Sequence, residues 1–155
     1  MNPKTFARTI DELNRSGARY NTLHGHFERF CAQAKRLAED SDSPLRGLLA
    51  NMDGDALLVQ FLDRRIRISM RYDRKTLKGV LHAEDESAVR PGLAPETFER
   101  VPFDGAGETA LSGGEHGDNL NLSLPADCLT LLVRLVDAAL GRDPWDVARD
   151  PGPLK

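Results

Sequence analysis

The sequence of 155 residues is poor in cysteine and tryptophan and has no long apolar run. Its two cysteines, Cys31 and Cys128, lie far apart among apolar neighbours, which favours buried free thiols in a reducing compartment over a disulfide. No apolar stretch approaches the roughly 18 residues of a membrane span. Residues 1–8 lack the apolar segment and cleavage site of an export signal. We therefore expect a cytoplasmic protein that does not contact membranes.

The sequence also lacks a cofactor or catalytic signature in a suitable context. Residues 105–110 match a loose dinucleotide-binding fingerprint, but Pro102 interrupts the strand that should precede it and Ser112-Gly113-Gly114 replaces the helix that should follow. The acidic residues 104–118 lack the spacing of a calcium-binding loop. Ser112, His116 and Asp118 are triad residue types, yet they are neighbours in one loop. We predict no cofactor and no catalytic residue.

Two other groupings contain chemically active residue types. His24, Glu28 and Cys31 fall at i, i+4 and i+7 of one helix, but they span about 10 Å, too far for a single ion. His82 and Glu84 share one face of a strand, a geometry that arises often by chance. We therefore predict no metal site, and an enzyme of unknown class is only the third functional hypothesis.

Charge is strongly segregated along the chain, although the net charge is only −3. Residues 61–80 contain seven basic and two acidic residues, which is 7 − 2 = +5. Residues 84–118 contain two basic and nine acidic residues, which is 2 − 9 = −7. Such asymmetry bears on partners and solubility and not on the fold.

Helical periodicity marks the N-terminal third of the chain. Residues 3–13 have one apolar stripe, and residues 14–17 predict a break before a longer helix over 18–39. Ser43 and Pro44 predict the start of a short helix with three leucines facing inward, Leu45, Leu48 and Leu49.

Strand periodicity follows. Residues 56–62, 65–72 and 76–83 predict three antiparallel strands, and in the second of them apolar residues alternate with arginines. Residues 119–124 predict a fourth strand, and Pro125 begins a final helix that ends at Gly141. The face covered by helices is expected to carry Leu57, Val59, Phe61, Ile66, Ile68, Met70, Leu77 and Leu81.

Residues 84–118 have no sustained periodicity and predict a long acidic loop, with a helical turn at 94–100 and an extended piece at 101–103. Residues 142–155 predict a C-terminal tail that docks through Trp145 and then frays. The expected fold is a single α+β domain over 1–141, with N-terminal helices, an antiparallel sheet of about four strands, and a C-terminal helix packed on one sheet face.

The open sheet face is the most specific candidate surface. Arginine is enriched at protein interfaces, so we predict a small non-enzymatic binding or regulatory module that docks a protein there, either a foreign partner or a second copy in a homodimer. The acidic loop could also cover this face within one chain. Nucleic-acid binding through residues 64–78 is the alternative, weakened by the lack of aromatic residues on that face. The predicted binding residues are Arg65, Arg67, Arg71, Arg74, Lys75 and Lys78.

Overall fold

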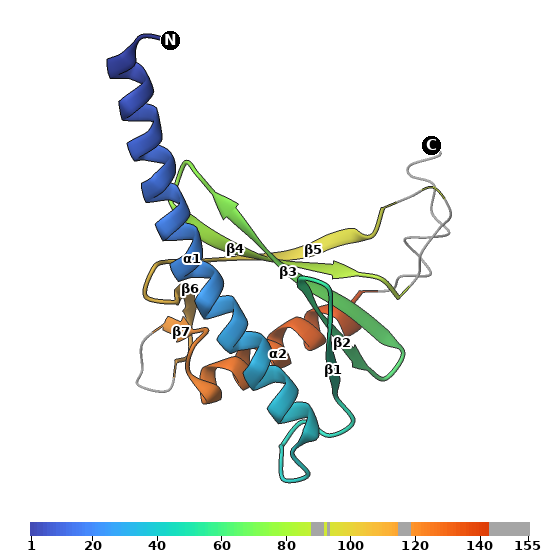
Figure 1. Cartoon of the computed structure of the whole chain (residues 1–155). Coiled ribbons are helices and arrows are strands. Elements are labelled where there is room, and N and C mark those ends of the chain that lie inside the picture. Colours follow the sequence, from blue (N-terminus) through green and yellow to red (C-terminus); the bar gives the residue numbers. More distant parts are fainter. Residues whose placement is uncertain (88–91, 93, 115–118, 143–155) are drawn as a thin grey trace.

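A computed structural model describes residues 1–87, 92, 94–114 and 119–142. The described residues form two helices and seven strands (Figure 1). In chain order these are α1 (Pro3–Glu39), β1 (Leu49–Asp53), β2 (Ala56–Phe61), β3 (Arg64–Asp73), β4 (Lys78–Asp85), β5 (Glu96–Phe103), β6 (Glu108–Ser112), β7 (Asn119–Asn121) and α2 (Pro125–Leu140). None of the helices seen in these ranges is both long and apolar enough to cross a bilayer.

The sheet is an antiparallel meander in which each strand pairs with the next one in sequence, from β1 to β7. β3 and β4 form its longest ladder, which runs from Ile66↔Asp85 to Asp73↔Lys78. The short turns between the first four strands fix this register, because an antiparallel hairpin needs only a few connecting residues. The result confirms the α+β class but corrects the expected number of strands, which was about four.

Both helices cover the same face of the sheet. Alternate residues of β2, β3 and β4 are buried there, as the period of two in their sequences requires. One core cluster joins these residues to buried side chains of α1 and α2. Its largest fully buried members are Phe27, Phe30, Phe103, Leu23, Leu57, Ile66, Ile68, Leu81, Leu120, Leu122, Leu131 and Leu132. In the part of the chain that the structure describes, no helix covers the other face of the sheet (Figure 1).

The N-terminal helix is continuous, so the predicted break at residues 14–17 was wrong. A glycine inside a helix costs about 1 kcal/mol, whereas ending one helix and nucleating another costs more. Asn2 caps the first turn by accepting a hydrogen bond from the backbone N–H of Thr5 at 2.8 Å. The N-terminal part of α1 extends well past the sheet (Figure 1).

The short helix predicted after Pro44 is absent from the described structure, where residues 49–53 form the edge strand β1. Gly54, with φ of +61°, turns β1 back into β2 and places Asp53 opposite Ala56. The burial of Leu48 and Ala50 on either side of the exposed Leu49 follows a period of two. The three leucines had suggested a helix because short apolar runs fit both periods.

Within the described residues of the acidic segment 84–118, residues 96–103 and 108–112 form the strands β5 and β6, which corrects the predicted loop and the predicted helical turn at 94–100. β5 pairs with β4 through a bulge at Ala83/Glu84, and this irregularity breaks the simple alternation that a sequence pattern would show. The extended piece at 101–103 is confirmed as the end of β5.

Other expectations have mixed outcomes. The three central strands and the final helix lie within two residues of the predicted bounds, but β7 ends at Asn121 instead of residue 124. Leu77 was placed on the covered face; it is 46% exposed in the β3–β4 turn. Cys31 and Cys128 are buried free thiols, as predicted. The tail around Trp145 lies outside the described residues.

Candidate protein-docking site

The predicted basic residues divide into two groups. Arg65, Arg67 and Arg71 alternate along β3 on the face away from the helices, and we call them the arginine ladder. Arg74, Lys75 and Lys78 lie at the tip of the β3–β4 hairpin, and all three are exposed. Leu58, Val80 and His82 share the open face with the ladder, because they lie opposite Arg67, Arg71 and Ser69.

Acidic residues of the same chain neutralise much of the arginine ladder. Arg67 donates to Glu86 at 2.6 Å and also to Asp53, and these two carboxylates raise its pKa. Arg65 lies 3.6 Å from Glu86. Arg71 makes only a long contact of 3.9 Å with Glu84, and its side chain is 65% exposed. The acidic segment thus covers part of the basic face within one chain, one of the two arrangements that the sequence had left open.

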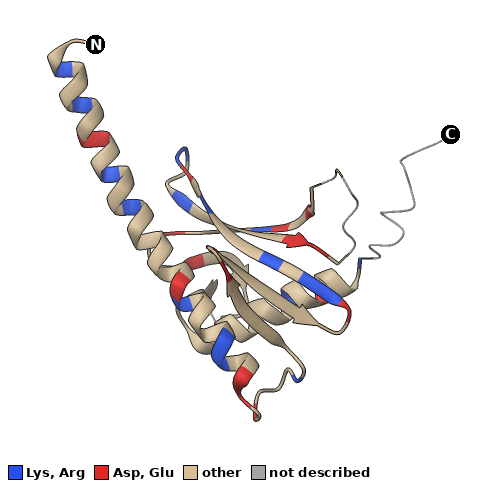
Figure 2. Ribbon diagram, turned by 45° about the vertical axis from the view of Figure 1, so that its right-hand side comes forward, with Lys and Arg blue, Asp and Glu red and all other residues tan. Residues whose placement is uncertain are grey.

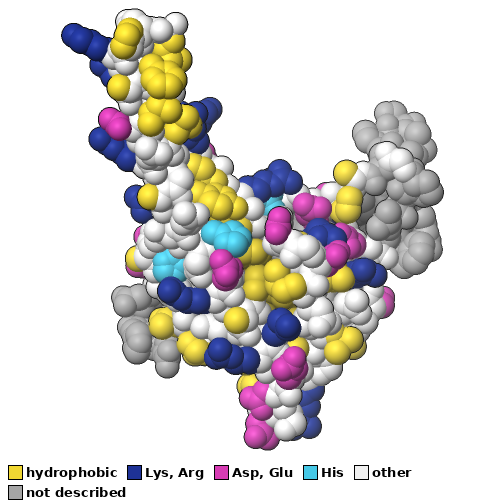
Figure 3. Space-filling view, in the orientation of Figure 1, with side chains coloured by type: hydrophobic (Ala, Val, Ile, Leu, Met, Phe, Trp, Pro, Cys, Tyr) yellow, Lys and Arg dark blue, Asp and Glu magenta, His cyan; other side chains and the backbone are white. Residues whose placement is uncertain are grey.

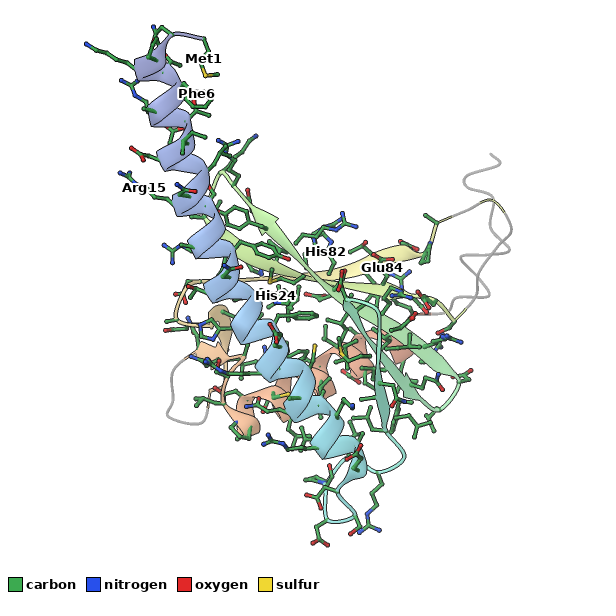
Figure 4. The ribbon with its side chains drawn as sticks, viewed as in Figure 1. Met1, Phe6, Arg15, His24, His82 and Glu84 are labelled. Atoms are coloured by element: carbon green, nitrogen blue, oxygen red, sulfur yellow. The ribbon has the colours of Figure 1, made fainter. Side chains whose placement is uncertain are left out.

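His82 completes the centre of the open face (labelled with Glu84 in Figure 4). Burial lowers its pKa, and the charges of Arg71 and Arg100 lower it further, while Glu84 acts in the opposite direction. Its Nδ1 atom is buried and has no hydrogen-bond partner among the described residues. Burial and the two arginine charges therefore favour the neutral form of this imidazole.

The hairpin cations are in a different situation. No ion pair involving Arg74, Lys75 or Lys78 occurs in the described part of the chain. Figure 2 shows the basic hairpin tip beside the N-terminal part of α1. A cleft of about 390 Å³ opens at this junction, lined by Glu12, Arg15, Ser16, Arg19, Tyr72, Arg74 and Leu77.

The cleft has a positive charge balance. Arg15, Arg19 and Arg74 face it with Glu12 as the one acidic lining residue, which is 3 − 1 = +2. The three arginines come from two elements, so the charge does not belong to a single helix face. Concave surfaces with one sign of charge concentrate ligands of the opposite sign.

The cleft also contains a buried hydroxyl group without a hydrogen-bond partner among the described residues and a strained backbone conformation. The buried hydroxyl of Tyr72 has no hydrogen-bond partner among the residues described, and its ring meets Tyr20 edge-on at 6.3 Å. Leu77 holds a left-handed backbone with φ of +58°, a strained conformation for a branched residue. Such strain is concentrated at functional sites more often than elsewhere.

An apolar stripe runs along a neighbouring flank of α1. Phe6, Ile10, Leu13 and Tyr20 are 58%, 40%, 52% and 40% exposed. Figure 3 shows the stripe as a strip of hydrophobic side chains along the projecting part of the helix, and Figure 4 places Phe6 and Arg15 on different flanks. Lone exposed apolar residues are ordinary, but contiguous ones mark interaction surfaces.

A serine–histidine pair, unnoticed in the sequence, joins α1 to the far end of the sheet. His26 Nδ1 lies 2.6 Å from Ser123 Oγ, and its Nε2 lies 2.9 Å from the carbonyl oxygen of Gly105. Because Nε2 must donate to that carbonyl, Nδ1 of the neutral ring accepts a hydrogen bond from the Ser123 hydroxyl group. Residues 97 positions apart gave no sequence signal for this contact.

The backbone of Gly107 approaches this pair closely. A Cβ atom added to Gly107 would lie 2.8 Å from His26 Nδ1, and Gly107 holds φ of +83°. A reacting carbonyl group needs about 3 Å of room beside both the nucleophile and its stabilising donors. The pair therefore acts as a structural clamp between α1, the β5–β6 turn and the start of α2.

The remaining sequence candidates do not assemble. His24 pairs with Glu28 at 2.8 Å on the helix surface, while Cys31 points into the core, where burial raises its pKa to about 12. Among the described residues, no group of three or more His, Cys, Asp or Glu side chains could hold a metal ion. His116 and Asp118 lie outside the described residues.

Comparison with known proteins gave no match to a family model, to a curated protein or to a solved structure.

Proposed function

We propose that the chain is a non-enzymatic protein-binding module and that the cleft between α1 and the β3–β4 hairpin receives an acidic segment of a partner protein. The observation that carries this proposal is the set of three cleft arginines without an acidic partner among the described residues. Arginine binds carboxylates with two parallel hydrogen bonds, which gives both affinity and orientation.

The surroundings of the cleft suit a peptide better than a small anion. Tyr72 and Leu77 supply apolar contact next to the charges, and Lys75 and Lys78 extend the positive surface along the hairpin. A partner segment with carboxylates beside an aromatic or aliphatic side chain would use both kinds of contact. Interfaces generally combine a small apolar centre with a polar rim.

The arginine ladder has a smaller role in this proposal. Arg65 and Arg67 already pair with carboxylates of their own chain, so a partner would have to displace Glu86 to reach them. Arg71 keeps most of its exposure and can contribute at the edge of the surface. Exchange of one ion pair for another gains little free energy in water.

Two matched triple variants test this division. One replaces Arg74, Lys75 and Lys78 with glutamine, and the other replaces Arg65, Arg67 and Arg71 with glutamine, so both remove three charges. The probe is a fluorescein-labelled peptide of glutamate residues interrupted by two phenylalanines. Its binding is measured by fluorescence anisotropy. We expect the hairpin variant to bind at least about tenfold more weakly and the ladder variant to change less than about threefold.

A peptide with lysine in place of glutamate is the control for charge. Equal binding of both peptides, or a larger loss in the ladder variant, would contradict the cleft as the site. Single-stranded and duplex oligonucleotides are tested in the same assay over a range of salt. If an oligonucleotide bound more tightly than the acidic peptide, with a steep salt dependence, nucleic-acid binding would replace the proposal.

A further inference from the structure

We infer that two copies of the chain pair antiparallel through residues 3–20 of α1, on an apolar surface that lies beside the cleft. Residues 6, 10, 13, 17 and 20 are spaced by four, three, four and three. This is the spacing of the a and d positions of a coiled coil, with Phe6, Leu13 and Tyr20 at d, and Ile10 and Gly17 at a. The four large side chains at these positions are all 40% exposed or more.

The charged residues of this segment avoid the same surface. With Phe6 at d, all of them fall at the outer b, c and f positions: Lys4, Arg8, Asp11, Glu12, Arg15 and Arg19. The flanking e and g positions hold small uncharged residues, Ala7, Thr9, Asn14 and Ser16. A second helix can therefore approach closely without meeting a charge of either sign.

Gly17 leaves a gap in the apolar surface that a large side chain of the second copy can fill. A Cβ atom added there would meet nothing within 4 Å, so no neighbour inside the chain requires a glycine at this helix-interior position. In an antiparallel pair centred between Asp11 and Glu12, Phe6 of each copy lies opposite Gly17 of the other. Ile10 then lies opposite Leu13. One two-fold axis satisfies both large-to-small contacts at once, as an isologous interface requires.

The antiparallel direction follows from where the rest of the chain is attached. Most of the sheet and α2 lie beyond the C-terminal end of this segment, and the β3–β4 hairpin reaches back beside residues 12–20 (Figure 1). A parallel pair would bring both bodies and both basic hairpins to the same end. Antiparallel pairing places the two bodies towards opposite ends of a helix pair about 27 Å long. Of the α1 residues that line the cleft, Glu12, Arg15 and Arg19 occupy outer positions, and Ser16 lies at a g position on the edge of the seam.

The area is adequate for a reversible dimer. Aromatic side chains bury roughly 150–250 Å² each and leucine and isoleucine less, so the eight side chains, about half exposed, would remove on the order of 600–800 Å² from water. The e and g residues of both helices add to this total. Standard interfaces bury about 1,200–2,000 Å², and weaker ones bury less, so a concentration-dependent dimer is the expected form.

Sedimentation velocity over roughly a hundredfold range of protein concentration is the first test, since a reversible dimer dissociates on dilution. We expect the sedimentation coefficient of the natural chain to rise with concentration. Phe6→Glu should remain monomeric, whereas Thr5→Glu, which adds the same charge at an outer position, should behave like the natural chain. A monomer throughout, or equal behaviour of the two variants, overturns the inference.

A second pair of variants tests the hole at Gly17. Gly17→Leu fills it and should weaken self-association by at least about tenfold, although it adds apolar surface and raises helix propensity. Ala18→Leu adds the same kind of bulk at an outer b position and should leave association unchanged. Tighter association of Gly17→Leu would mean that general hydrophobicity drives the contact, and would overturn the register.

Cysteine cross-linking tests the direction. Ala7 and Asn14 both occupy e positions, which face each other across an antiparallel seam. A mixture of Ala7→Cys and Asn14→Cys chains should form a disulfide-linked dimer on mild oxidation, whereas either variant alone should not. Cys31 and Cys128 do not interfere, because both are buried. Efficient linking of Thr9→Cys to Asn14→Cys would instead show parallel pairing, because a g position faces the following e position of the partner only when the helices are parallel. Because the acidic-peptide assay uses other residues, either proposal can fail without the other.

Discussion

The two parts of α1 have similar sequences and opposite environments. In residues 21–39, Leu23, Phe27 and Phe30 are at most 2% exposed and form the centre of the core. In residues 3–20, Phe6 and Leu13 recur at comparable helical spacing, yet more than half of each side chain is exposed. An amphipathic pattern thus shows that a helix has an apolar surface and does not show what covers it.

The comparison also explains how the projecting part exists. Isolated helices shorter than about 12–15 residues are marginal in water, because the first turn is costly to form. The packed part of α1 provides that turn, and the projecting part extends it with one hydrogen bond per residue. The Asn2 cap then satisfies an N–H group at the open end. The apolar stripe is therefore not needed for the helix itself.

The strongest way to test this contrast is to delete one phenylalanine from each part. Phe27→Ala should destabilise the chain by about 3–5 kcal/mol, because it leaves a cavity in the core. Phe6→Ala should change the unfolding free energy by less than about 0.5 kcal/mol. Urea denaturation at low protein concentration, where self-association does not contribute, measures both. Similar losses from the two variants would show that the projecting part packs against the domain.

The thiols buried beneath the packed part give the second prediction. Burial raises the pKa of Cys31 and of Cys128 to about 12, from an ordinary value of 9.0. The folded state therefore keeps these protons at a pH where the unfolded state loses them. The stability that the thiols contribute is fully present below about pH 9 and is lost between about pH 9 and 12.

The loss at pH 10 should reach about 2–3 kcal/mol for the pair of thiols, as measured by urea denaturation. A chain with both Cys31→Ala and Cys128→Ala should show a flatter decline over the same pH range. If the double variant declined as steeply as the natural chain, other groups would be the cause of the pH dependence.

Two histidines on the same helix sharpen the contrast further. His26→Ala removes both bonds of the clamp and leaves the Gly105 carbonyl without that donor, so we expect a loss of about 1–2 kcal/mol. His24→Ala removes only a surface pair with Glu28 and should cost less than about 0.5 kcal/mol. Thermal or urea unfolding compares the two. A larger loss from His24→Ala would contradict the assignment of the clamp.

The elements that the sequence predicts well are those whose pattern is local. The alternation of Ile66, Ile68 and Met70 with arginines predicts a strand, because successive side chains of a strand point to opposite faces of the sheet. Pro125 and Gly141 bound the last helix for similarly local reasons. β5 was not predicted, because the bulge near Glu84 and the charged residues of the strand interrupt the alternation of apolar and polar residues. Its place in the sheet depends on pairing with β4.

The candidate site was only partly predictable for the same reason. Hairpin periodicity indicated that Arg74 and Lys75 belong to a turn and that Lys78 lies on the open face of the next strand, and both are local properties. The approach of Arg15 and Arg19 to that turn depends on α1 running straight through Gly17, where the sequence suggested a break. Arg67 pairs with Glu86 and Asp53, which lie in other segments of the chain. Neither the residue types nor their spacing in the sequence predicts such contacts.

The smallest expected effect on stability comes from replacing one glycine in each part of α1. Gly25 and Gly17 both lie in the helix, and an added Cβ at either position would meet nothing within 4 Å. Gly25→Ala should raise the unfolding free energy by about 0.5–1 kcal/mol, because this part of the helix unfolds together with the core. Gly17→Ala should increase the helix signal in circular dichroism but shift the urea midpoint less, since the projecting part can fray while the core stays folded. Equal midpoint shifts for the two variants, measured on dilute monomeric chains, would show that α1 unfolds as one cooperative unit and that its projecting part is not energetically separate.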